Sequence, residues 1–188
     1  MKNFLLAALL LLGLSSVASA QNNTVKVNVF SPLVRTGSFF YEHKVSEHNS
    51  VQLGGLFTAW SVGDTKISGF ALTPEYRFYL SDSKPALEGF YFAPFARYQN
   101  LTLTVTDAYL DLDGSVSDGK ASLNTFGGGV LAGYQLMFKR RFTLDAFFGP
   151  SYNGGSLKIT AGNTSQSFDA GSFQGFGLRT GITFGVAF

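Results

Sequence analysis

Single charged side chains stand among apolar residues along this 188-residue sequence, and they are the first candidates for chemistry. Glu75 and Arg77 are two positions apart, so they project from one face of an extended chain. A buried unpaired charge costs on the order of 5 kcal/mol, so we expect such charges to pair. They predict either an interior salt-bridge network or the gate of an ion path. The candidates are Lys26, Glu42, Lys44, Glu75, Arg77, Arg97, Asp145 and Arg179.

The histidines offer a second kind of chemistry. A histidine beside a serine and a carboxylate can transfer or hydrolyse a lipid acyl chain, and Glu42, His43 and Ser46 are close in sequence. Adjacent residues of a strand project from opposite faces, however, which separates Glu42 from His43. His48 lies next to a predicted turn. A lipid-modifying enzyme therefore stays an alternative, and no catalytic residue is predicted.

An acidic segment at residues 107–118 suggests calcium binding at first sight. Its carboxylates are Asp107, Asp111, Asp113 and Asp118. The calcium-loop pattern D-x-[DN]-x-[DN]-G followed by Glu at position 12 is not met. We predict a solvated loop, with weak contact to divalent ions or lipopolysaccharide as the alternative. The glycine run at 127–129 has no helix after it and is not a phosphate loop. No metal or cofactor is predicted.

The composition restricts the class of protein. Charged residues make up 14% and aromatic residues 15% of the chain, which has 22 Gly, 20 Phe and no Cys. A disordered chain would be richer in charge and poorer in aromatics. The lack of Cys excludes disulfides, thiolate zinc sites and a Cys nucleophile. A formal net charge of +2 gives no electrostatic case for nucleic acid. One domain of β-structure in lipid fits these values.

Residues 1–20 have the pattern of a cleavable signal peptide. Lys2 supplies the positive charge, residues 4–14 are apolar, and Ala18-Ser19-Ala20 matches the A-x-A cleavage pattern. The apolar run is shorter than the roughly 20 residues of a spanning helix, so a membrane anchor is only the alternative. Residues 21–188 are predicted to be the mature domain. They contain no long apolar run, so they can enter a membrane only as strands.

The mature sequence alternates with a period of two, most clearly from Phe176 to Phe188, where large residues occupy the even positions. Such alternation predicts strands with one apolar face. About ten residues per strand suit a tilted crossing of a bilayer. Eight strands are predicted at residues 24–31, 37–45, 51–62, 67–80, 89–105, 122–138, 142–152 and 176–188.

Prolines and one irregularity disturb the pattern. Pro74, Pro94 and Pro150 lie inside predicted strands and lack an N–H for the ladder, so we predict bulges there. After Gln99 the apolar positions change from even to odd numbers, which predicts a slip in the alternation of the fifth strand.

The connections alternate in length. Short ones at 46–50, 81–87 and 139–141 follow even-numbered strands, whereas long ones at 106–120 and 154–172 follow the fifth and seventh strands. In an up-and-down barrel with a periplasmic N-terminus, both long loops are extracellular. Aromatic residues near the strand ends predict interfacial girdles. These residues are Phe30, Tyr41, Tyr79, Phe90, Phe138, Phe142 and Tyr152.

The charges within the strands decide which face meets lipid. A soluble lipocalin-like carrier turns its apolar face inward, whereas a membrane barrel turns it outward. Charges on the polar face favour the membrane barrel, and the interior of an eight-stranded barrel is narrow enough for side chains to fill. The predicted fold is an all-β, eight-stranded, antiparallel up-and-down transmembrane β-barrel with a charged lumen. The lipocalin-like carrier is the alternative.

The end of the sequence resembles the terminal strand of Gram-negative outer-membrane barrels, because Phe184, Val186 and Phe188 alternate with small residues. The resemblance implies recognition by the barrel-assembly machinery. Residues 24–188 also resemble the small barrels of the OmpA and OmpX type, and more closely an uncharacterised outer-membrane β-barrel family of unknown function. The similar stretches are 28–33, 40–42, 72–79 and 133–135. This resemblance implies the fold and a Gram-negative outer-membrane location. It implies no activity.

The expected function is a structural role or an interaction role. The barrel would contact outer-membrane lipid and lipopolysaccharide, and its long loops would meet an unidentified extracellular partner. A narrow ion-conducting pore is an alternative, beside the lipid-modifying enzyme and the soluble carrier.

Overall fold

The computed structural model describes residues 21–81, 84–110, 116–161, 164–169 and 175–188. Strands dominate these residues, and a 3₁₀ turn, η1 (Ser31–Val34), follows the first of them. Among the described residues, no helix is long and apolar enough to cross a membrane. The strands are β1 (Asn23–Asn28), β2 (Thr36–Lys44), β3 (Asn49–Val62), β4 (Thr65–Tyr79), β5 (Gly89–Leu110), β6 (Val116–Phe138), β7 (Phe142–Ala161), β8 (Thr164–Asp169) and β9 (Gly175–Ala187).

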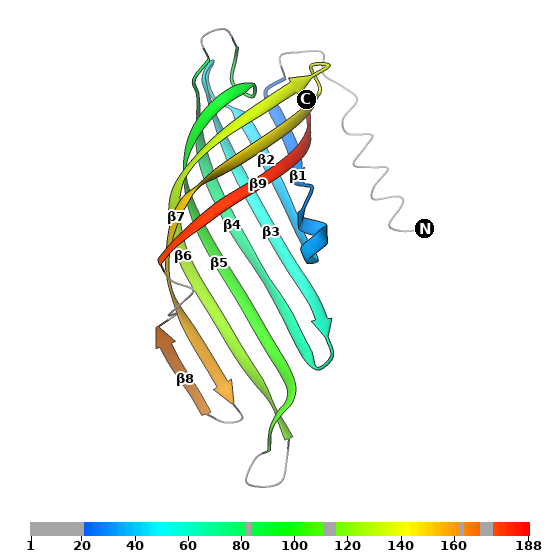
Figure 1. Ribbon diagram of the computed structural model, residues 1–188, viewed down its shortest axis with the longest axis vertical. Helices are drawn as coiled ribbons and strands as arrows, with labels where there is room; N and C mark the ends of the chain where they lie inside the picture. Colours follow the sequence, from blue (N-terminus) through cyan, green and yellow to red (C-terminus); the bar gives the residue numbers. More distant parts are fainter. Residues whose placement is uncertain (1–20, 82–83, 111–115, 162–163, 170–174) are drawn as a thin grey trace, which may run out of the picture.

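The sheet closes on itself. Each strand from β1 to β7 pairs antiparallel with the next, β7 also pairs with β9, and β9 returns to β1 through pairs such as Val25 with Val186. β1–β7 and β9 therefore form an eight-stranded up-and-down barrel, which confirms the predicted fold (Figure 1). The ninth described strand, β8, pairs with the far end of β7 and lies outside the barrel wall.

The strand boundaries differ from the prediction at the end of β1 and in the hairpins beyond the barrel wall. β1 ends at Asn28, earlier than predicted, and η1 follows it with Pro32 in its first turn. The two predicted long loops are largely strand: β5 continues to Leu110, β6 begins at Val116, and β7 continues to Ala161. The prediction of loops was wrong because these segments alternate weakly in sequence. Their strand structure comes from backbone pairing within each hairpin.

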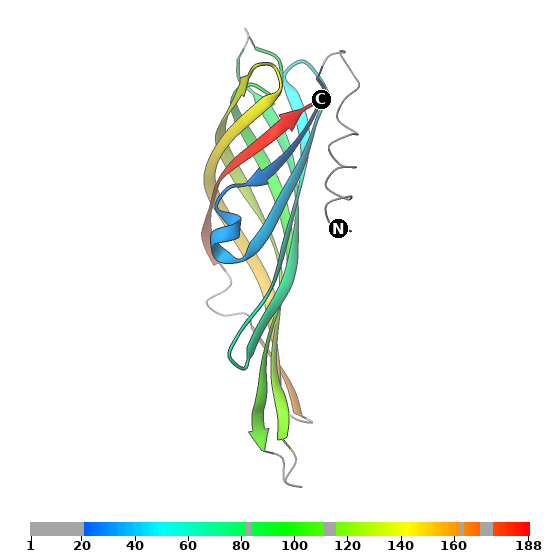
Figure 2. The same ribbon diagram turned by 90° about the vertical axis from the view of Figure 1, so that its right-hand side faces the viewer.

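The two ends of the barrel differ. The β2–β3, β4–β5 and β6–β7 connections lie at one end with the C-terminus, and we call it the short-turn end (Figures 1 and 2). The β5–β6 and β7–β8 hairpins extend from the opposite, hairpin end. There residues 65–69, 100–110, 116–124 and 154–161, together with β8, form what we call the projecting sheet.

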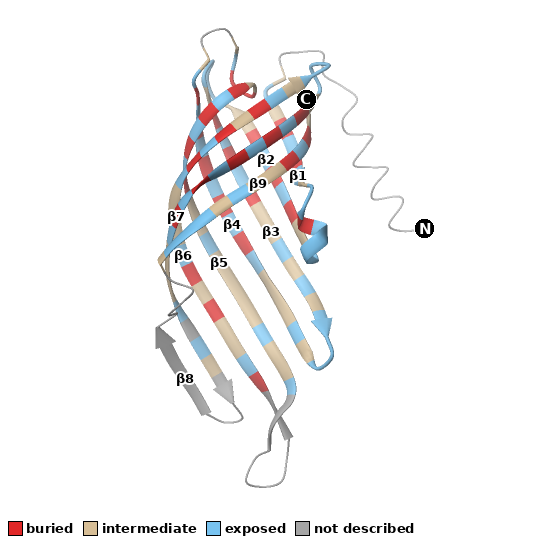
Figure 3. Ribbon diagram, in the orientation of Figure 1, coloured by how far each residue is buried: buried red, intermediate tan, exposed pale blue. Residues whose placement is uncertain are grey.

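Exposure alternates along the strands of the barrel wall (Figure 3). In β4, Leu72 and Phe78 are exposed, whereas Glu75 and Arg77 between them are buried. An outer apolar surface with a polar interior is the arrangement of a membrane barrel. The outer apolar ring includes Val25, Val27, Phe39, Tyr41, Leu53, Phe70, Leu72, Phe78, Phe92, Val130, Leu144, Phe148 and Phe184.

The predicted slip in the fifth strand is wrong. β5 and β6 keep one register through Gln99 as far as Val105, and the first shift lies between Val105 and Tyr109. What changes is the surroundings: Leu101 pairs with Leu123 on the interior side of the projecting sheet, where Leu123 is 7% exposed. Beyond the apolar ring the outer face no longer needs to be apolar, so the pattern changes face although the strand does not slip.

The predicted bulges are also wrong, because the register continues through each of the three strand prolines. Pro74 pairs with Leu53, Pro94 with Val130 and Pro150 with Leu178. On the other side of each proline the pairing is interrupted and resumes in the same register. Each missing N–H therefore costs a local ladder contact without displacing the strand.

Candidate functional site

Six of the eight predicted charged residues lie close together inside the barrel. Arg77 is central: its Nη1 is 2.8 Å from Oδ2 of Asp145 and 3.6 Å from Oε2 of Glu42, and its Nη2 is 3.1 Å from Oε2 of Glu75. Three cations meet three carboxylates, so the formal charges of the group balance. We call these six residues the ion network: Lys26, Glu42, Glu75, Arg77, Asp145 and Arg179.

Lys26 enters the ion network from β1. Its Nζ lies 2.5 Å from Oε2 of Glu42 and 3.3 Å from Oδ2 of Asp145, and it also donates to Oε1 of Gln135 at 2.5 Å. The side chains of Lys26, Glu42 and Asp145 have no solvent exposure. Removing one of them would leave a buried charge without its partner, which is far more costly than loss of a surface pair.

Arg179 enters from β9, on the hairpin side of the ion network. Its Nη2 is 2.7 Å from Oε1 of Glu75. Its guanidinium lies over the rings of Phe95 and Phe147, at 4.8 and 5.0 Å from their centroids. The ion pair and the two cation–π contacts together fix the position of this guanidinium.

Two tyrosines complete the carboxylate contacts, and sequence reasoning missed this role. The hydroxyl of Tyr79 donates to Glu42 at 2.7 Å, and that of Tyr91 donates to Asp145 at 2.8 Å. Tyr79 is 4% exposed, so its prediction as a girdle residue was wrong. It shares the inward parity of Arg77, and that parity was the signal available in the sequence.

Two glutamines supply amide partners. Gln52 donates to Oε2 of Glu75 at 2.9 Å. Gln135 accepts from Arg77 at 3.2 Å and donates to the carbonyl oxygen of Leu87 at 2.9 Å. With these residues, each of the eight barrel strands contributes at least one side chain to the ion network or to its direct partners.

Glycines make room for this filled interior. A Cβ at Gly133 would collide with the ring of Tyr91, and one at Gly185 would come within 2.6 Å of Cγ of Lys26. The close approach therefore requires glycine at both positions.

The short-turn end of the interior is covered by the β4–β5 connection. Leu87 is fully buried at a positive φ of 81°, and Ala86 is 3% exposed. The backbone N–H of Ala86 donates to the carbonyl oxygen of Glu47 at 2.5 Å. This apolar pair inside a polar turn was the available sequence signal for a cap, and it was missed.

Lys44 and Arg97 do not join the ion network, although they were predicted with it. Lys44 is the last residue of β2, at the mouth of the short-turn end, and it forms no ion pair within the described residues. Arg97 lies on β5 toward the hairpin end, and its Nε donates to Oε1 of Gln99 at 3.2 Å. Both have inward parity, but their depth along the barrel separates them from the carboxylates.

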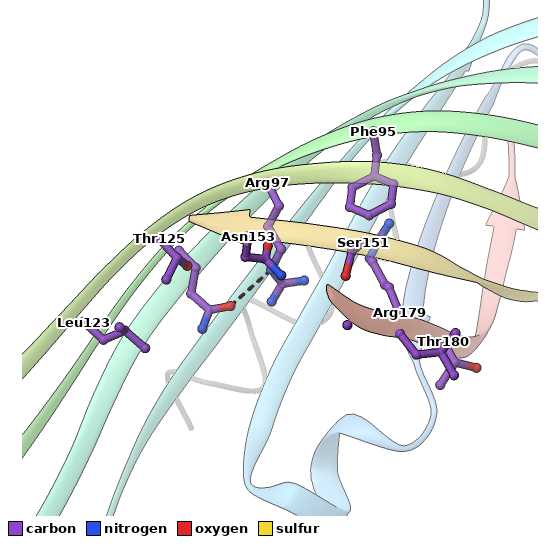
Figure 4. A pocket seen from close by; sticks show the side chains of 11 residues that line it. Phe95, Arg97, Leu123, Thr125, Ser151, Asn153, Arg179 and Thr180 are labelled. Atoms are coloured by element: carbon purple, nitrogen blue, oxygen red, sulfur yellow. Dashed lines mark hydrogen bonds between the residues drawn. The ribbon is translucent and has the colours of Figure 1, made fainter. Parts of the chain in front are cut away.

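Arg97 and Arg179 line a cavity of about 380 Å³ on the hairpin side of the ion network (Figure 4). Among the described residues, its lining contains no acidic side chain. We call this cavity the vestibule. The polar groups around it include Arg97, Gln99, Thr125, Ser151, Asn153 and Arg179.

The histidine cluster of the sequence does not come together with a carboxylate. His43 Nδ1 lies 2.8 Å from Oδ1 of Asn23, whereas Glu42 points into the barrel. The hydroxyl of Ser46 accepts from Nδ2 of Asn49 at 2.9 Å. The side chains of the acidic segment 107–118 fall outside the described residues, as does the predicted signal peptide at residues 1–20.

The predicted assembly signal lies in the strand that closes the barrel. Phe184 of β9 is exposed on the outer surface and stacks with Phe142, their centroids 6.0 Å apart. The backbone N–H of Phe188 donates to the carbonyl oxygen of Asn23 at 2.9 Å. Val186 pairs with Val25. Recognition of these residues by the assembly machinery stays a prediction.

A closed eight-stranded antiparallel barrel with an apolar outer ring and charges inside has the fold of an outer-membrane β-barrel. The chain belongs to the family described as protein of unknown function (DUF3575), whose model matches residues 5–158. The match ends before β8, which belongs to the projecting sheet, and before β9, which closes the barrel.

Two solved structures are similar to this chain. One is a major outer membrane protein from Thermus thermophilus, with 16% identity, a TM-score of 0.51, and coverage of 90% of this chain and 100% of that one. The other is the N-terminal β-barrel domain of Pseudomonas aeruginosa OprF, with 11% identity, a TM-score of 0.39, and coverage of 89% and 98%. No curated protein matches the chain. The first likeness shows a common barrel fold.

Proposed function

We propose that this protein is a non-conducting outer-membrane anchor that holds the projecting sheet outside a Gram-negative cell for contact with a partner. The ion network carries the proposal. Its six residues balance their formal charges, and side chains from every barrel strand fill the cross-section around them. A hydrated path for ions would need a gap in this cross-section, so the contacts support a closed barrel.

The outer apolar ring supports the membrane location. Phe39, Leu72 and Phe148 are exposed on it although they are large and apolar. A soluble protein rarely leaves a continuous apolar surface of this kind in water. Hydrocarbon around the ring, with lipopolysaccharide at its outer margin, removes the free-energy cost of exposing this apolar surface to water.

The edge of the projecting sheet supports an interaction role. Within the described residues β8 pairs with β7 alone, and it stands at the end of the strand order. The free backbone groups of an edge strand can pair with an extended segment of another protein. We therefore expect a protein partner that adds a strand beside β8. The contacts of His43 and Ser46 offer no catalytic arrangement, so no enzymatic activity is proposed.

Cysteine labelling on intact cells tests the location and the orientation. The natural chain has no Cys, so each introduced thiol reports a single position. We expect Lys66→Cys, in the projecting sheet, to react with a membrane-impermeant maleimide on intact cells. The matched variant Arg140→Cys, at the short-turn end, should react only after the outer membrane is permeabilised. The reverse labelling pattern would contradict the orientation. Recovery of the labelled protein in the soluble fraction would contradict the membrane anchor.

In-cell crosslinking tests the interaction. A thiol at position 166 of β8, introduced as Gln166→Cys, should give a crosslinked species with a second protein on intact cells. Arg140→Cys serves as the control. Crosslinks absent from position 166, or equal at both positions, would contradict a partner at β8.

A further inference from the structure

We propose that the vestibule binds a small oxyanion, the phosphate or carboxylate group of a water-soluble ligand, between Arg97 and Arg179. Both guanidinium groups line the vestibule, and both also line a second, smaller cavity of about 130 Å³ beside it. Like charges that line the same two cavities repel each other. An anion between them would convert this repulsion into two attractions.

Arg97 has unused donors. A guanidinium carries five N–H donors in a planar fork that matches the oxygens of phosphate and carboxylate. Among the described residues, the hydrogen bond of Arg97 is the one from Nε to Gln99. Its two Nη groups therefore remain available on the vestibule side.

Arg179 offers a positive charge from a fixed position. Its Nη2 is held by Glu75, and its guanidinium is held by the rings of Phe95 and Phe147. Its Nη1 is buried and makes no hydrogen bond within the described part of the chain. Because Nη1 has less than 1 Å² of accessible surface, Arg179 contributes its positive charge to the vestibule, and Arg97 supplies the accessible donors.

The surroundings favour an anion over a cation. The formal charges of the ion network balance with Arg179 included, so Arg97 is the surplus charge of the vestibule. Within the described part of the chain, the vestibule lining has no carboxylate but includes the hydroxyl and amide groups of Thr125, Ser151 and Asn153. These groups can contact the remaining ligand oxygens or hydroxyls. Access is from the hairpin side, since the ion network fills the barrel on the other side.

Titration of the folded full-length chain in detergent micelles tests the proposal. Inorganic phosphate and succinate serve as probes, at constant ionic strength, and calorimetry follows binding. We expect saturable binding of at least one probe, which identifies whether phosphoryl or carboxylate groups are preferred. Arg97→Gln should weaken that binding at least ten-fold. Lys66→Gln, which removes the same charge from an exposed position outside the vestibule, should leave it unchanged.

A gel that compares heated and unheated samples checks that each variant is folded. Two further variants keep the binding test decisive if Arg97→Gln fails this check. Thr125→Asp would place a carboxylate in the vestibule and should abolish binding, whereas Arg97→Lys keeps the charge without the planar fork and should weaken it less than Arg97→Gln. The proposal is overturned if neither probe binds saturably, or if Lys66→Gln weakens binding as much as Arg97→Gln.

Discussion

The two halves of the barrel interior use the same residue types in opposite ways. Toward the short-turn end, Arg77 faces three carboxylates within 3.6 Å. Toward the hairpin end, Arg97 has only the neutral Gln99 as a hydrogen-bond partner in the described chain. Arg179 belongs to both halves, because it pairs with Glu75 and also lines the vestibule.

The matched charges stabilise the folded barrel, whereas the unmatched charge is available to a ligand. In the ion network each charge is matched, so every member depends on the others and the barrel is closed there. In the vestibule the charge is unmatched, so it contributes little to folding and remains free for a ligand. Substitutions in the two halves should therefore differ sharply in their cost.

The largest effect is expected from Arg77→Ala. It leaves Glu42, Glu75 and Asp145 with insufficient positive charge, and breaking buried pairs in this way costs about 3–5 kcal/mol. Lys44→Ala is the matched control, because Lys44 has inward parity without an ion pair in the described chain. Urea unfolding in lipid or detergent, followed by the fluorescence of the single tryptophan, Trp60, measures both. Equal free energies of unfolding for the two variants would remove the distinction.

Leu87→Ala should be the next most destabilising change. Leu87 is fully buried in the cap, and truncating a buried leucine costs about 2–5 kcal/mol. The same unfolding measurement applies, with Leu80→Ala on the exposed outer surface as the control. A variant as stable as the wild type would show that the β4–β5 connection does not cover the interior.

Gly133→Ala should have an intermediate effect. The added methyl group collides with the ring of Tyr91, which donates to Asp145, and overpacking of this kind costs about 1–3 kcal/mol. Tyr91→Phe removes the hydroxyl and keeps the ring, so the two variants divide the steric from the hydrogen-bonding contribution. Unchanged unfolding of Gly133→Ala would mean that the ring can move freely.

Arg97→Gln should have the smallest effect on folding. Its hydrogen bond to Gln99 contributes about 1 kcal/mol, and removal of one of the two like charges that line the vestibule offsets part of that loss. We expect the free energy of unfolding to change by less than about 1 kcal/mol. A loss as large as that of Arg77→Ala would place Arg97 in the ion network after all.

Period-two alternation was enough to predict the barrel and the inward parity of its charges. It could not predict how deep each residue lies, because depth depends on strand tilt and pairing register. Lys44 and Arg97 were therefore grouped with residues that they do not contact. The same limit hid the cap at Leu87, whose position follows from how a turn folds back onto the barrel.

The projecting sheet shows a second limit. The change of apolar positions after Gln99 looks like a register slip in one strand. It becomes intelligible only when Leu101 is seen beside Leu123 on the partner strand. The same limit applies to the prolines, because the cost of a missing N–H depends on which neighbouring strand the proline nitrogen faces.

Conductance in planar bilayers tests the closed barrel most directly. Purified, folded protein should give no discrete conductance steps, with insertion verified by the heat-dependent gel mobility of protein recovered from the membrane. Arg77→Ala, if it inserts, is the variant expected to leak. Discrete steps from the wild-type protein would contradict the closed barrel.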